Sequence, residues 1–288
     1  MSNIQITENG SGKYSPEWFY SESQTPEWIS FAHKADELRE NFINLFGIER
    51  LKSLFGKDLL TSLFYNDEGT KTNLCYRLEM DKDIREVFGS ISGGAAYKFG
   101  LFYHKKNQSW TCGSPLKPIH LTEDEAIQKA EEMRNDLVEG AEIISSFGPL
   151  DSEKDYEQLY KQLEHIPGIN MVWRMKYYQM LFPTLFAPFY GQDIQLRVLH
   201  FLNQKPSDIP FIRMGQISLY ARKCNVPGVV FAHIYGKNVG YTNETNDSDT
   251  NTLSDKKHKT HYWMYTVFDD KSWNECQQKG IMVLGMDD

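Results

Sequence analysis

One stretch of the sequence combines basic and aromatic side chains and contains no acidic residue. Between residues 91 and 120 the formal charges are those of four lysines, Lys98, Lys105, Lys106 and Lys117. Lysine holds phosphate groups and aromatic rings stack on bases, so this combination is typical of a nucleic-acid contact. We therefore predict a contact surface made by Lys98, Tyr103, Lys105, Lys106 and Trp110. The alternative is a half-buried sheet whose lysines are merely solvated.

A run of small residues, 90–94, precedes the lysines. Ser90, Gly93 and Gly94 leave the backbone accessible, and exposed amides at these positions could bind a phosphate. A tight turn or bulge before a strand explains the same residues, because a single glycine-rich loop is weak support for a phosphate site. We keep both interpretations.

A second basic region covers residues 195–237, where Asp208 is the one acidic residue among six lysines and arginines. Arg213, Arg222 and Lys223 fall on or beside one candidate helix and could contact a phosphate backbone or a groove. A solvated helix face is the alternative. The net charge of −8 argues against nucleic-acid binding over the whole surface, so any contact must be local.

Motifs for catalysis and for metal binding are weak in this sequence. The four cysteines lie far apart and form no Cys/His cluster, which argues against zinc. Residues 10–13 (GSGK) are similar to part of a P-loop, but Tyr14 stands where a magnesium-binding Ser or Thr belongs. Glu79, Asp81 and Lys82 are a faint version of a nuclease site. We expect no catalytic residue, no metal site and no cofactor.

The elements that position the candidate residues follow from hydrophobic periodicity. Apolar residues at three- and four-residue steps predict a long helix from Pro26, with short helices at residues 49–55 and 58–64. Alternating polarity predicts strands at residues 73–80 and 95–103.

Residues 106–108 could turn the second of these strands back into residues 109–112 as a hairpin. Thr122 and Glu125 predict a capping box for a helix that runs to about Ile144. Residues 16–149 are thus expected to form an α+β domain, after a flexible lead at residues 1–15.

Residues 150–236 are expected to form an all-helical domain. Its candidate helices, punctuated by X-Pro pairs, are residues 153–165, 171–182, 194–202, 211–223 and 227–235. Residues 237–260 have the composition of a disordered linker. Residues 261–288 contain strand-like runs but are too few for a stable core. We expect the fold class to be α+β with a partial third domain at this end.

Three segments resemble parts of the N-terminal regions of McrB-like AAA+ restriction subunits. Residues 88–101 (FGSISGGAAYKFGL) are similar to one segment of those regions, and residues 173–183 (WRMKYYQMLFP) to the helical module that follows. Residues 262–265 (YWMY) and 280–285 (GIMVLG), with Trp273 between them, resemble the first strands of an EVE or PUA-like domain. The similarity covers about residues 16–235 and 258–288.

The resemblance implies a function in restriction and antiviral defence. In McrB-type systems an N-terminal module reads particular or modified DNA, and a C-terminal AAA+ motor works with a nuclease partner. EVE and PUA-like domains flip modified bases into an aromatic pocket. The resemblance makes Trp263 and Trp273 possible base-stacking residues, with the hydrophobic core as the alternative. Met286 departs from the pattern, because a Trp usually follows this Gly in EVE-like domains.

The expected function is therefore DNA recognition and targeting, without catalytic activity in this chain. The first alternative is a protein-interaction scaffold in the same defence complex, docked through the acidic residues 123–144 and the aromatic helical unit. The second is a metal-dependent nuclease around Glu79 and Asp81. No signal peptide and no apolar run of about 18–20 residues is visible, so we expect a cytoplasmic protein outside the membrane.

Overall fold

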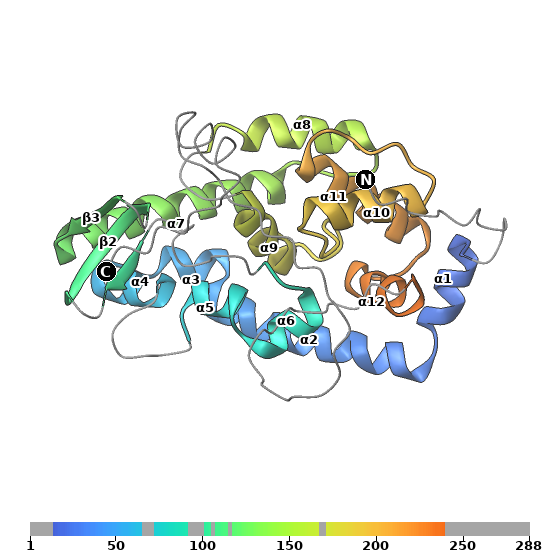
Figure 1. The fold of residues 1–288 in the computed structure, drawn as a ribbon, viewed down its shortest axis with the longest axis horizontal. Helices are drawn as coiled ribbons and strands as arrows, with labels where there is room; N and C mark the ends of the chain where they lie inside the picture. Colours follow the sequence, from blue (N-terminus) through green and yellow to red (C-terminus); the bar gives the residue numbers. More distant parts are fainter. Residues whose placement is uncertain are drawn as a thin grey trace, which may run out of the picture. The chain divides into compact units, whose positions relative to one another are not determined.

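The computed structural model describes residues 14–64, 72–91, 101–104, 107–114, 117–166 and 171–239 (Figure 1). The chain divides into two compact units, Met1–Glu244 and Thr245–Asp288, and all described residues belong to the first. They form mostly helices and one small antiparallel sheet, which confirms the α+β class. The predicted linker beyond residue 239 and the predicted EVE-like segment at residues 261–288 lie outside the described residues.

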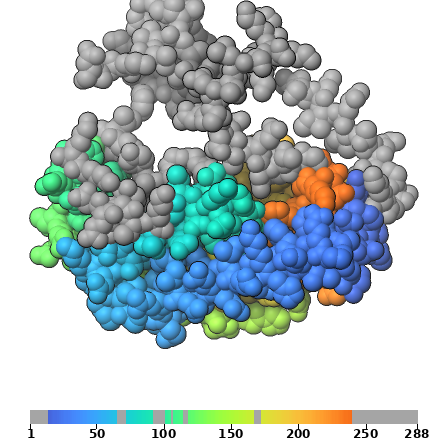
Figure 2. Space-filling model, turned by 90° about the horizontal axis from the view of Figure 1, so that it is seen from below, coloured from blue at the N-terminus to red at the C-terminus, as the bar shows by residue number. Residues whose placement is uncertain are grey.

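The first helices are α1 (Pro16–Ser23) and α2 (Pro26–Phe46). Both begin with proline, which is tolerated in a first helical turn because the N–H there has no partner within the helix. The predicted long helix is confirmed, and Figure 2 shows it crossing one face of the molecule beside α6. Two short helices follow as predicted, α3 (Ile48–Lys52) and α4 (Gly56–Leu63).

The strand predicted at residues 73–80 is wrong, because this segment is helix α5 (Leu74–Glu79). The Asn73 side chain caps it by accepting a hydrogen bond from the Tyr76 N–H at 2.8 Å. Asp81 caps the next helix, α6 (Lys82–Phe88), through the Ile84 N–H. A short, mostly buried helix can show the same alternation of apolar and polar residues as a strand. The capping side chains of Asn73 and Asp81 favour the helices here.

The predicted hairpin is confirmed, and a third strand completes the sheet. Strands β1 (Phe102–His104), β2 (Ser109–Ser114) and β3 (Lys117–Leu121) lie in the order β1-β2-β3 with antiparallel pairing throughout. Strand β3 was not predicted. It lies at an edge of the described sheet, a position where a proline such as Pro118 is tolerated. Residues 95–100 of the strand predicted at residues 95–103 lie outside the described residues.

Helix α7 (Glu123–Ser146) follows the sheet and opens with the predicted capping box, in which the Thr122 hydroxyl accepts from the Glu125 N–H. The five helices predicted after it are confirmed, with ends that differ by at most four residues. They are α8 (Glu153–Leu163), α9 (Met171–Leu181), α10 (Gln192–Phe201), α11 (Pro210–Lys223) and α12 (Gly228–Val239). None of the described helices is both long and apolar enough to span a membrane.

The boundary expected near residue 150 does not separate the packing of these helices. Helix α12 packs on α1 and α2, while α9 packs on α2, α5 and α7. Helix α9 lies at the centre, and its side chains from Trp173 to Met180 are all buried. The aromatic residues Trp173 and Tyr177 therefore belong to the core.

Candidate nucleic-acid interface

The three-stranded sheet carries the described part of the predicted contact surface. Tyr103 pairs with Trp110, and Trp110 pairs with Leu121, so these three residues share one face. The sheet packs on the first turns of α7, directly after β3 in the chain (Figure 1). Trp110 is 5% exposed, and Tyr103 is half-buried against it with ring centroids 5.4 Å apart.

The burial of Trp110 corrects one predicted contact, because a ring inside the core cannot stack on a base. Its indole instead supports the sheet by an edge-to-face contact with Tyr103. Tyr103 keeps part of its surface in water, so a contribution to binding stays a prediction. The strand register places both rings on the face that the core covers, which the sequence alone did not show.

The hairpin connection runs from His104 to Ser109, which pair as the last residue of β1 and the first of β2. Four residues connect them, and Gln108 adopts the left-handed conformation with φ of 47°. Lys105 and Lys106 occupy the first two turn positions in the sequence, but they lie outside the described residues. In the sequence, this lysine pair therefore lies in the connection between the neighbouring strands β1 and β2.

The far edge of the sheet is exposed and carries no acidic residue. Ile119 is 57% exposed, and Pro118 and His120 are exposed beside it. The His120 Nδ1 lies 3.2 Å from the Ser109 hydroxyl on the neighbouring strand. No Asp or Glu occurs from residue 101 to residue 121, so no carboxylate of the sheet itself repels an approaching phosphate.

Of the small residues predicted to bind phosphate, Ser90 lies among the described residues and is half-buried. It follows Gly89, which ends α6 with φ of 77°, a conformation that favours glycine. This agrees with the turn interpretation for the start of the run. Gly93, Gly94 and Lys98 lie outside the described residues, as do Trp263 and Trp273, so their predicted contacts stay predictions.

Arg213 was predicted to contact a phosphate, and the structure corrects this. The side chain is 2% exposed inside the helical region. Its Nε donates to the Gln195 amide oxygen at 3.0 Å, and its Nη1 donates to the Ser207 and Asp208 carbonyl oxygens at 2.9 and 3.1 Å. A guanidinium with these partners holds the α10–α11 connection and cannot reach a nucleic acid.

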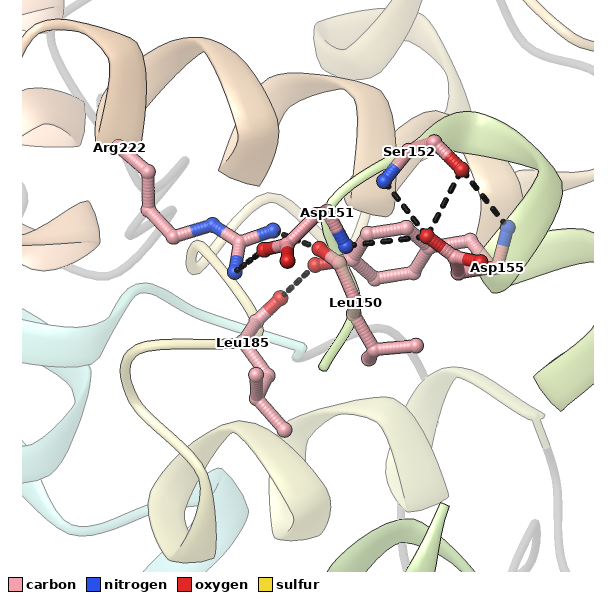
Figure 3. A network of polar contacts seen from close by, with 7 residues as sticks. Leu150, Asp151, Ser152, Asp155, Leu185 and Arg222 are labelled. Carbon is pink, nitrogen blue, oxygen red and sulfur yellow. Dashed lines mark hydrogen bonds and ion pairs between the residues drawn. The ribbon is translucent and has the colours of Figure 1, made fainter. Parts of the chain in front are cut away.

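Arg222 is also used inside the protein, as Figure 3 shows. It donates to the Leu150 carbonyl oxygen and lies 3.8 Å from the Asp151 carboxylate, so it holds the connection between α7 and α8. The next residues form a capping box in which the Asp155 carboxylate accepts from the Ser152 N–H at 2.8 Å. Of the three predicted residues on α11, only Lys223 is exposed.

Several other buried polar side chains, like these arginines, donate to backbone carbonyls of other elements or connections, which gives a buried donor a partner inside the fold. The donors are Tyr177 Oη to Phe46 O, Arg134 Nη1 to Leu51 O and Leu54 O, Arg174 Nη1 to Ile166 O, and Lys176 Nζ to Gly89 O. The sequence does not show this role, because most of the acceptors are distant in the chain.

The residues of the nuclease hypothesis have structural roles in the described part of the chain. Asp81 caps α6 and accepts from Arg77 Nη1 at 2.6 Å, and Glu79 is 3% exposed. Within the described ranges, no three His, Cys, Asp or Glu side chains are grouped as metal ligands. Burial raises the pKa of the Cys75 and Cys224 thiols, so neither is activated as a nucleophile.

One hollow between α2 and the α5–α6 pair has room for about one water molecule, too little for a cofactor. Comparison with models of protein families, with curated proteins and with solved structures finds no match to this chain.

Proposed function

We propose that this chain is a nucleic-acid recognition and targeting module that contacts DNA through the sheet β1-β2-β3. The observation that carries the proposal is the charge of this sheet. Its strands and connections contain lysines and no acidic residue, in a protein whose net charge is −8. A local cationic surface on an acidic protein restricts phosphate contact to one site.

The proposed contact set differs from the one expected from sequence. Lys98, Lys105 and Lys106 stay in it, and Lys117 and His120 at the β3 edge join it. Trp110, Arg213 and Arg222 leave it because they are buried or bonded within the fold. Lys223 lies on α11, so we assign it no place in the sheet surface.

The resemblance to McrB-like proteins supports DNA, including DNA with modified bases, as the target. It also supports an AAA+ motor and a nuclease as partners that supply the hydrolytic steps. In this proposal the chain contributes recognition to an antiviral restriction system, and no catalytic step is assigned to it.

The first test is binding of the purified chain to labelled duplexes, unmodified or carrying methylated or hydroxymethylated bases. We expect binding that weakens at least tenfold when Lys98, Lys105 and Lys106 are all changed to Glu. The matched control changes Lys34, Lys154 and Lys161, which are exposed on other helices, to Glu.

The control has the same change in charge as the test variant, so it separates local contact from net repulsion. Equal affinities of the two variants for every duplex would remove the sheet as the contact surface. Binding that is strong for one modified duplex and retained in the control variant would support a reader module.

A scaffold role is the second candidate, and one observation favours it. The outer face of α7 exposes acidic side chains, Glu132, Glu139 and Glu142 among them, that a basic partner could recognise. The aromatic helix α9 is buried and drops out of this hypothesis. Light scattering after size exclusion tests it, because a scaffold forms a complex with the motor or nuclease without DNA.

A further inference from the structure

The C-terminal end of α6 is held by two bases that come from distant parts of the chain. His233 on α12 places its Nε2 at 2.9 Å from the Val87 carbonyl oxygen. Lys176 on α9 donates from its Nζ to the Gly89 carbonyl oxygen at 2.6 Å. These are carbonyls of the last turn and cap of α6, which helix geometry leaves without partners of their own.

Lys176 is completely buried, which is unusual for a lysine that could carry a charge. Its Nζ lies 5.7 Å from the centre of the Tyr190 ring. The charged groups that face it are Arg85 on α6 and, with opposite sign, Glu79 and Asp81. Burial lowers the pKa of Lys176 to about 7, with Arg85 acting in the same direction and the two carboxylates against it.

His233 lies among aromatic rings. Its imidazole is 4.4 Å from the Phe31 ring and 6.4 Å from the Trp28 ring, measured between centroids. Contact with a carbonyl oxygen requires a proton on Nε2, which the neutral ring can supply. Burial lowers the pKa of His233 below its usual value. Lys237, four residues further along α12, is paired with Glu27.

We propose that Lys176 and His233 form a proton-sensitive clasp on the C-terminal end of α6. In their neutral forms both side chains donate hydrogen bonds to the two carbonyl oxygens without placing a charge in the interior. Protonation places two positive charges in the interior, where exposure to water becomes favourable and the end of α6 opens more often. The clasp closes as pH rises and loosens as pH falls.

The clasp lies at the end of α6, from which the chain continues to the sheet. Gly89 ends α6, and β1 of the sheet begins at Phe102, so the clasp fixes the point from which the chain runs to the sheet. This inference goes beyond the proposed function and does not depend on it, because the opening of α6 is measured without nucleic acid.

Hydrogen exchange measures the opening directly in the wild-type chain. Peptides covering residues 82–91 are compared at pH 7.0 and pH 8.5 after correction for the intrinsic exchange rate. We expect roughly tenfold less opening at pH 8.5, because the open state binds Lys176's proton more strongly than the closed state does. Peptides of α8 serve as the internal reference and should show no comparable change.

Two test variants and one control variant identify the groups responsible. Lys176→Met should abolish the difference between pH 7.0 and pH 8.5, while Lys82→Met, which removes an exposed lysine of α6, should keep it. His233→Gln should remove the additional opening below pH 6.5. The clasp is overturned if wild-type α6 and α8 have the same pH dependence, a result that needs no variant to fold.

Discussion

The buried amine of Lys176 makes a quantitative prediction about global stability. Its pKa is about 7 in the folded chain and 10.5 when exposed, so the unfolded chain binds more protons between these two values. Stability therefore rises with pH across this window and stops changing below pH 7, where both states are protonated. From pH 7 to pH 9 this one group contributes an increase of about 2 kcal/mol.

The perturbation is Lys176→Met, which keeps an unbranched side chain of similar length and removes the amine. The assay is urea unfolding of wild type, Lys176→Met and Lys82→Met at pH 7, 8 and 9. Other groups that titrate in this range are common to all three proteins. The difference in the free energy of unfolding between wild type and Lys176→Met should therefore change by about 2 kcal/mol from pH 7 to pH 9.

The free energy of unfolding of Lys82→Met should change with pH in parallel with that of the wild type. Lys82 is exposed on α6, the helix that Gly89 ends. Parallel curves for wild type and Lys176→Met would refute the reasoning, because they would mean that the amine is solvated in the folded chain.

Three further predictions follow from packing and capping. Gly140→Ala places a methyl group 1.9 Å from the Tyr178 hydroxyl oxygen and should cost about 1–3 kcal/mol in urea unfolding, with part of the loss recovered by adding Tyr178→Phe. Arg213→Ala leaves buried carbonyls without a donor and should cost about 2–4 kcal/mol while the salt dependence of DNA binding is unchanged. Thr122→Ala removes the α7 capping box and should lower thermal stability by about 1 kcal/mol, whereas Thr61→Ala on α4 serves as a hydroxyl-removal control.

Local signals in the sequence predicted most of the helices. Proline at the start of α2, the Thr122–Glu125 capping box and the apolar spacing of α8 and α11 each act within a few residues. The same locality explains the error at residues 73–80, where a six-residue helix is too short to show a helical period.

Predictions of the site were less accurate because burial depends on contacts that are distant in sequence. Arg213 looked like a surface cation, but Gln195 and the Ser207 and Asp208 carbonyls surround it. Lys176 was not singled out, since nothing near it in the sequence indicates that Gly89 is its acceptor. Chemical type can be read locally, whereas exposure requires the packed fold.

The salt dependence of DNA binding tests the central claim most directly. The logarithm of the association constant is measured against the logarithm of salt concentration for wild type, for the Lys98, Lys105 and Lys106 to Glu variant, and for the Lys34, Lys154 and Lys161 control. We predict that the magnitude of this negative slope decreases by roughly 2–3 in the first variant, because each lost phosphate contact lowers it by about 0.9. The control should keep the wild-type slope. Equal slopes in all three proteins, or no binding by the wild type to any duplex, would contradict DNA recognition through this sheet.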